Sequence, residues 1–124
     1  MKRLVTALSI VVATSVSAFA QSLPVPSYWR NQRGSEMKIY AIDAKGNFKG
    51  IYINHGGPGC QNSPFNLAGK EKVGGHVTFI VVWTNFMQNC NSQTVWHGRI
   101  EGKTIGTRWE LLSVRGSDIF QQLL

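Results

Sequence analysis

Residues 94–112 have the sequence TVWHGRIEGKTIGTRWELL, and this stretch decides the fold. It contains two segments in which apolar and polar side chains alternate, separated by Glu101-Gly102-Lys103. Alternation with a period of two is typical of a β-strand with one buried face, and glycine supplies the positive φ that a tight hairpin turn requires. Residues 94–112 are therefore predicted to form an antiparallel β-hairpin.

The same alternation continues on both sides of this hairpin, and the breaks at residues 44–47 and 73–75 again contain glycine. No helical period extends over a useful length of residues 21–124. Short hairpins in series predict an antiparallel meander, and eight strands can close into a barrel just wide enough for one small ligand. The predicted fold class is therefore all-β, an eight-stranded antiparallel up-and-down barrel. Its strands are expected near Tyr28–Asn31, Ser35–Asp43, Phe48–Asn54, Phe65–Lys72, Val77–Asn85, Thr94–Ile100, Thr104–Leu112 and Asp118–Gln122.

Parity predicts which side chains enter the barrel, because alternate residues of a strand face opposite sides of the sheet. In the second strand it places Ile39 and Ala41 inward and Ile42 outward. In the fifth strand it places Asn85 on the inward face together with Trp83.

Three tryptophans, Trp83, Trp96 and Trp109, share the inward face. Aromatic side chains dominate many cores, so core filling is one interpretation of this pattern. Polar side chains on the same face favour a ligand site instead, because an unpaired buried polar group costs roughly 1 to 3 kcal/mol and a polar ligand would satisfy it. The inward polar residues are Ser35, Tyr52, Asn54, Thr94 and Asp118.

Residues 1–20 have the pattern of a secretory signal peptide. Lys2 and Arg3 are followed by an apolar run, and the small residues that end at Ala20 suit cleavage before Gln21. The apolar run is shorter than the roughly 20 residues of a membrane-spanning helix, and a retained membrane anchor is the alternative. We expect residues 21–124 to form one barrel domain that is secreted or periplasmic and has no membrane association after cleavage.

The composition argues against several function classes. Thirteen Lys and Arg against six Asp and Glu give a net charge of +7, but these residues are scattered along the sequence and form no run. Nucleic-acid-binding domains cluster their basic residues on one face, so no nucleic-acid partner is predicted. His55, His76 and His97 lack a metal-ligand spacing, and no nucleophile with a base is evident. We therefore predict no metal site, no cofactor and no enzymatic activity.

The chain has two cysteines, Cys60 and Cys90. An even number of cysteines in an exported chain indicates a disulfide. Closing the intervening loop would stabilise the fold by about 3 to 4 kcal/mol in the chain-entropy model. Two unlinked buried thiols are the alternative.

Six short motifs, in order along the chain, resemble those of the avidin family, which includes streptavidin. The two cysteine segments, residues 59–64 and 89–92, are similar to those of its dimeric, rhizavidin-like branch, in which the two cysteines are bonded to each other. This resemblance covers nearly all of residues 21–124. The motifs are W-x-N-x-x-G-S at Trp29–Ser35, G-x-Y at Gly50–Tyr52, W-x-N at Trp83–Asn85, T-x-W-x-G at Thr94–Gly98, I-x-T-x-W-x-L-L at Ile105–Leu112 and D-x-F at Asp118–Phe120.

The resemblance implies non-covalent binding of biotin inside the barrel. Biotin joins a urea ring, a thioether and an acidic tail. The family pattern assigns the urea oxygen to the donors Asn31, Ser35 and Tyr52, and the urea N–H groups to the acceptors Asn54 and Asp118.

The remaining parts of biotin have their own expected partners. Thr94 would approach the sulfur, and Trp83, Trp96 and Trp109 would enclose the rings with Phe79 as support. The tail carboxylate is expected near Ser92 and near Gln61, Asn62 and Ser63 of the cysteine loop. The alternative function is a secreted small barrel that binds another small ligand or a protein partner.

An outward apolar stripe predicts a homodimer. Parity points Thr78, Ile80, Val82 and Val95 away from the barrel interior, and a twofold interface would cover them. Tetrameric avidins complete each site with a tryptophan that a neighbouring subunit provides between its seventh and eighth strands. The expected connection at residues 113–117 contains no tryptophan, so the resemblance favours a dimer, with a tetramer as the other option.

Overall fold

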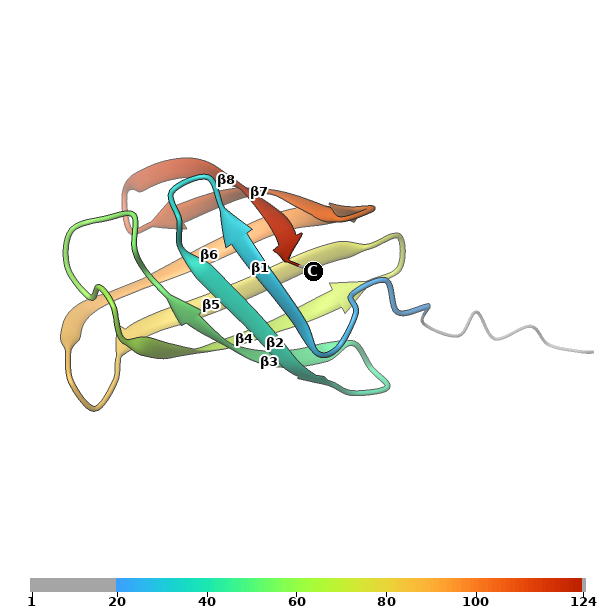
Figure 1. Ribbon diagram of the computed structural model, residues 1–124, viewed down its shortest axis with the longest axis horizontal. Helices are drawn as coiled ribbons and strands as arrows, with labels where there is room; N and C mark the ends of the chain where they lie inside the picture. The colour runs from blue at the N-terminus through green and yellow to red at the C-terminus, as the bar shows by residue number, and fades with distance from the viewer. Residues whose placement is uncertain (1–19, 124) are drawn as a thin grey trace, which may run out of the picture.

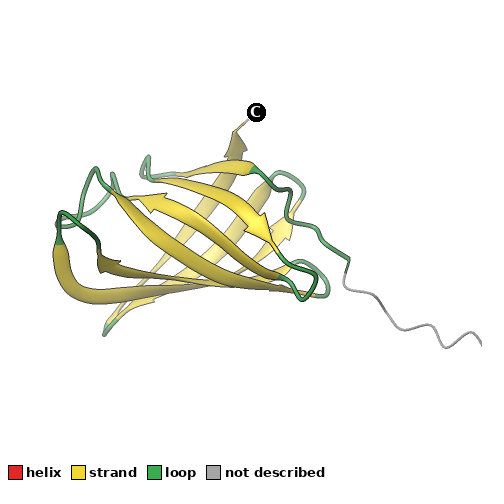
Figure 2. Cartoon of the chain, turned by 90° about the horizontal axis from the view of Figure 1, so that it is seen from below, coloured by secondary structure: helices red, strands yellow, loops and turns green. Residues whose placement is uncertain are grey.

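The computed structural model describes residues 20–123, which form a closed barrel of eight antiparallel strands (Figures 1 and 2). Each strand pairs with the next, and β8 pairs with β1 to close the sheet. The predicted fold class is therefore confirmed. The strands are β1 (Ser27–Asn31), β2 (Glu36–Ile42), β3 (Asn47–Ile53), β4 (Pro64–Lys72), β5 (His76–Thr84), β6 (Asn89–Glu101), β7 (Thr104–Leu111) and β8 (Val114–Leu123).

The expected signal peptide lies outside the described residues, apart from Ala20. Residues 20–123 contain no helix with the length and hydrophobicity needed to span a membrane. The structure therefore describes the expected barrel domain, residues 21–123.

The interior is packed with aromatic side chains from strands distant in sequence. Trp29, Phe65, Phe79 and Phe120 are at most 1% exposed. The ring of Phe120 on β8 contacts the rings of Phe79 on β5 and Tyr52 on β3, with centroids 5.9 and 6.4 Å apart. These contacts tie opposite sides of the barrel together, since burying each large aromatic side chain removes a large apolar surface from water.

The second strand departs from simple alternation. The pairing of β2 with β3 shifts register between Ile39 and Ala41, which is the mark of a β-bulge. The prediction for this strand end was wrong: Ala41 is exposed, while Ile42 is half-buried and packs against the core. A bulge inserts one extra residue, so it reverses the parity of every residue beyond it.

Most strand ends differ from the prediction by one residue, and the starts of β6 and β8 differ by more. β6 begins at Asn89, so Cys90 and Ser92 are part of a strand. β8 begins at Val114, so the expected connection at residues 113–117 is mostly strand, and only Leu112 and Ser113 form the turn. Asn85 lies beyond β5 and directs its side chain to Ser63 and Pro64. Glycine at position 116 and asparagines around Cys90 resemble turn residues, but cross-strand pairing overrides these local preferences.

The two ends of the barrel differ. The connections after β1, β3, β5 and β7 lie at one end, and the segment before β1 covers the other. In that segment Leu23 is 1% exposed and belongs to the core. The carboxylate of Glu71, itself 1% exposed, accepts hydrogen bonds from the backbone N–H groups of Leu23 (3.0 Å) and Ser22 (2.8 Å). Glu71 therefore anchors the segment that closes this end.

Replacing Glu71 with alanine should destabilise the barrel. The change removes two charge-assisted hydrogen bonds and leaves two backbone N–H groups without acceptors, so we expect the free energy of unfolding to fall by about 3 kcal/mol. Denaturant unfolding followed by tryptophan fluorescence measures this. Glu110→Ala, on the exposed face of β7, is the control and should change stability by less than about 0.5 kcal/mol. Equal effects of the two variants would contradict the anchoring role.

Candidate ligand-binding site

A cavity of about 380 Å³ opens at the end of the barrel opposite the Glu71 anchor. This volume is in the range of pockets that hold small organic ligands. All ten principal residues expected at the site lie on its wall: Asn31, Ser35, Tyr52, Asn54, Trp83, Ser92, Thr94, Trp96, Trp109 and Asp118.

The amide of Asn31 is oriented by the turn that follows β1. Its Oδ1 accepts hydrogen bonds from the backbone N–H groups of Ser35 (2.9 Å) and Arg33 (3.1 Å). Its Nδ2 then faces the Tyr52 hydroxyl at 3.4 Å. Because the amide oxygen is occupied by backbone donors, Asn31 presents its NH₂ group to the cavity.

The Ser35 hydroxyl is held in the same region. It accepts a hydrogen bond from the backbone N–H of His55 (3.0 Å) and lies 3.4 Å from Oδ1 of Asn54. The hydroxyl donates its proton to this Asn54 oxygen, so a ligand N–H that took its place there would free the proton for an acceptor in the cavity. Asn31 and Ser35 therefore both act as donors at this wall.

Tyr52 is buried between these donors and the aromatic wall. Burial raises the pKa of its phenol well above the usual value of 10.0, and the negative charge of Asp118 raises it further. The phenol therefore keeps its proton throughout the physiological pH range and can donate a hydrogen bond.

Asp118 supplies a negative charge to a buried part of the wall. It is 4% exposed, and its Oδ2 accepts a hydrogen bond from Nε1 of Trp96 (3.2 Å). Its Oδ1 lies 3.4 Å from Nε2 of Gln32, whose Oε1 accepts from the backbone N–H of Ile119 (2.8 Å). These contacts fix the carboxylate and leave it able to accept further hydrogen bonds, since a carboxylate has about four lone-pair positions.

Three tryptophans form part of the cavity wall. Trp96 and Trp109 are direct cross-strand partners of β6 and β7. Trp83 donates its indole N–H to the Thr94 hydroxyl (2.8 Å). Phe79 stacks behind Trp96, where the sequence placed it as support. The apolar ring faces thus remain available to a ligand while each indole N–H of Trp83 and Trp96 has an acceptor.

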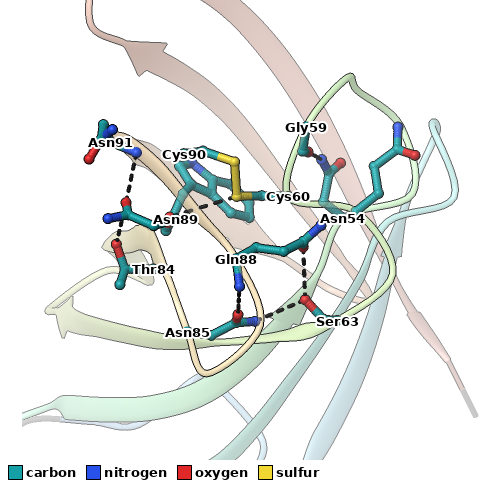
Figure 3. The surroundings of a disulfide bond; sticks show 12 residues. Asn54, Gly59, Cys60, Ser63, Thr84, Asn85, Gln88, Asn89, Cys90 and Asn91 are labelled. Atoms are coloured by element: carbon teal, nitrogen blue, oxygen red, sulfur yellow. Dashed lines mark hydrogen bonds between the residues drawn. A yellow bond between two sulfur atoms is a disulfide. The ribbon is translucent and has the colours of Figure 1, made fainter.

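A disulfide fastens the loop between β3 and β4 (Figure 3), and both of its cysteines line the cavity. Cys60 of this loop is bonded to Cys90 of β6, so the predicted disulfide is confirmed. The Asn54 side chain donates to the carbonyl of Gly59 (3.2 Å) and accepts from the backbone N–H of Gly56 (3.1 Å). The loop is therefore fastened at both ends.

Three residues expected near the ligand tail are not on the cavity wall. Gln61 donates to the carbonyl of Gly57, Asn62 contacts Nδ1 of His55 (2.8 Å), and Ser63 is buried against Gln88. Sequence reasoning missed other lining residues, because parity cannot place the side chains of turns. These are Arg33, Gly56, Gly57, Pro58 and Gly59; the two bonded cysteines, Leu111 at the end of β7 and Val114 at the start of β8 also line the cavity.

The site combines donors on one wall, a buried carboxylate and aromatic faces, and this defines a barrel that holds one polar ligand in its interior. A family model described as the Avidin family matches residues 19–121, and the chain belongs to this family.

Individual relatives agree with this assignment. Afifavidin from Afifella pfennigii is 41% identical over 101 residues, which are 77% of this chain; the chain spans 62% of the length of afifavidin. The crystal structure of a shwanavidin variant in complex with biotin superposes with a TM-score of 0.76 at 38% identity, covering 84% of this chain and all of that one. The rhizavidin–biotin complex gives a TM-score of 0.75 at 39% identity, covering 82% and 93%.

Proposed function

We propose that this protein binds biotin non-covalently inside the barrel and does not act as an enzyme. The observation that carries the proposal is the meeting of three donors, Asn31, Ser35 and Tyr52, with the buried carboxylate of Asp118 in one cavity. The biotin complexes of shwanavidin and rhizavidin support the choice of ligand.

The urea group of biotin matches the polar wall. Its oxygen would accept from the Asn31 amide, the Ser35 hydroxyl and the Tyr52 phenol, and Asp118 would accept from one urea N–H. The second N–H would take the place of the Ser35 hydroxyl at Oδ1 of Asn54, which frees that hydroxyl for the urea oxygen. Preorganised donors bind strongly because little rearrangement opposes binding.

The proposed role is binding without turnover. Cys60 and Cys90 are consumed by the disulfide and supply no nucleophilic thiol. Within residues 20–123, no group of three or more His, Cys, Asp or Glu side chains is placed to hold a metal ion. The polar lining residues instead form fixed hydrogen bonds that suit recognition.

Calorimetric titration of the purified protein with biotin tests this function. We expect one biotin to bind per chain with a Kd well below micromolar and to be recovered unchanged. Asp118→Ala should weaken binding by about 100-fold or more, because a buried urea N–H would lose a charged acceptor. Ser92→Ala, at the outer part of the wall, should cost about tenfold or less. Binding only at millimolar biotin would overturn the proposal.

We also propose that the chain is exported and cleaved before Gln21. The charged and apolar pattern of residues 1–20 supports this, and the disulfide suits an oxidising compartment. The anchored residues Ser22 and Leu23 follow directly after the proposed cleavage point. Expression of the full chain in a bacterial host should give periplasmic protein whose intact mass begins at Gln21; a mass that retains Met1 would contradict export with cleavage.

We propose a homodimer formed by the outer face of β5 and β6. Ile80 and Val95 are direct cross-strand partners on this face, and Val82 beside them is 52% exposed. A second copy that packs by twofold symmetry would remove this stripe from water.

Light scattering at micromolar concentration should give twice the monomer mass, and Ile80→Lys should give a monomer that still binds biotin. Tyr40→Lys, on the exposed outer face of β2, is the control and should leave the mass unchanged. A tetramer or a monomer of the unmodified chain would show the dimer to be wrong.

A further inference from the structure

Two charged side chains, Arg33 and Asp118, line the cavity among the described residues. Asp118 lies on β8 and is buried, whereas Arg33 belongs to the turn between β1 and β2 and is exposed. The cavity is therefore negative at a buried position and positive at its rim. This arrangement suits a ligand that has hydrogen-bond donors at one end and a negative charge at the other.

Arg33 extends along the rim between two elements. Its stem lies directly on Gly56 of the β3–β4 loop, where an added Cβ would come within 2.4 Å of the Arg33 Cβ. Its guanidinium lies over the Trp109 ring, 5.5 Å from the ring centroid. A guanidinium at this distance from an aromatic face is held by a cation–π interaction.

A second glycine makes room for the same pair. The Trp109 ring lies against Gly116 of β8, where an added Cβ would be 2.2 Å from Cζ2. Gly56 of the β3–β4 loop therefore leaves space for Arg33, and Gly116 of β8 leaves space for Trp109. The position of the guanidinium thus depends on three separate parts of the chain.

The charge of Arg33 is open to a ligand. In the described part of the chain, both ion pairs use Glu36, with Arg30 and His55 as its partners. The positive charge of Arg33 also acts on Tyr52 inside the cavity. Burial and Asp118 raise the pKa of Tyr52, whereas Arg33 lowers it.

We propose that Arg33 binds the carboxylate of the ligand tail and makes the site select free biotin over biotin whose carboxyl group is joined in an amide. This inference rests on the proposed biotin-binding function. Gln61, Asn62 and Ser63, expected to contact the tail, make their hydrogen bonds elsewhere. A guanidinium at the rim can form a charge-assisted hydrogen bond with a carboxylate, whereas a neutral amide tail gains no such attraction.

The test compares the Kd of biotin with that of biotinamide, in which a primary amide replaces the carboxylate. Both ligands share the same rings, so any difference in affinity reports on the tail. We expect the unmodified protein to bind biotin about tenfold more tightly than biotinamide, and this ratio to fall as ionic strength rises because the pair is near solvent.

Arg33→Gln should reduce the ratio to about one, because it weakens the binding of biotin. The Kd of biotinamide should stay within about twofold of its value for the unmodified protein. Retained biotinamide binding also shows that the variant is folded. Arg30→Gln is the matched control, since Arg30 is exposed and paired with Glu36, and it should keep the tenfold ratio. Arg33→Lys should retain part of the ratio, because it keeps the charge but loses the planar group.

The alternatives give different results. Equal Kd values for the two ligands in the unmodified protein would overturn the proposal, as would a tenfold ratio that survives in Arg33→Gln. If Arg33→Gln weakened the binding of both ligands equally, Arg33 would contact the rings that the two ligands share. This result would also overturn selection of the carboxylate. If the unmodified protein bound neither ligand, the proposed biotin-binding function would itself fail.

Discussion

Closure of the sheet between β1 and β8 is the constraint on which the rest of the structure depends. The pairing of Asn31 with Phe120 brings the first polar turn of the chain beside its last strand. Gln32 then lies against Asp118 and Ile119, far away in sequence. An open sheet would leave these groups at opposite edges, so the cavity exists only because the barrel is closed.

The polar groups of the interior are satisfied by the β1–β2 turn and by a side chain of β6. Backbone N–H groups of the β1–β2 turn occupy the oxygen of Asn31, and Trp96 occupies one oxygen of Asp118. Each group therefore presents a defined donor or acceptor to the cavity before any ligand arrives. Such preorganisation reduces the free energy that ordering would otherwise cost on binding.

One end of the barrel is filled and the other is open, and each is held by a specific contact. At one end Leu23 fills the interior and Glu71 anchors the segment that carries it. At the other end the disulfide fastens a glycine-rich loop whose small residues leave space for a ligand. The cavity therefore lies between a filled end and a fastened open end, where residues of the β1–β2 turn and the β3–β4 loop line it.

The alternation in the sequence predicted the barrel and most of its inward face, because a period of two is a local property of each strand. It placed Trp83, Trp96, Trp109 and Asp118 inward, and all four line the cavity. Its prediction failed at the bulge between Ile39 and Ala41, where one extra residue shifts the parity. It also failed at residues 114–117, where pairing with β7 extends a strand through apparent turn residues.

Which turn and loop side chains reach the site follows from the folded barrel and not from local alternation. Arg33 lies in a turn, where no periodicity assigns a direction, and its position depends on Gly56 and Trp109. Ser63 lies in the cysteine loop but turns to Gln88 and away from the cavity, because hydrogen bonds with the neighbouring loop satisfy its hydroxyl. Strand positions follow from local alternation, whereas the direction of these side chains is set by contacts between segments that meet only in the folded barrel.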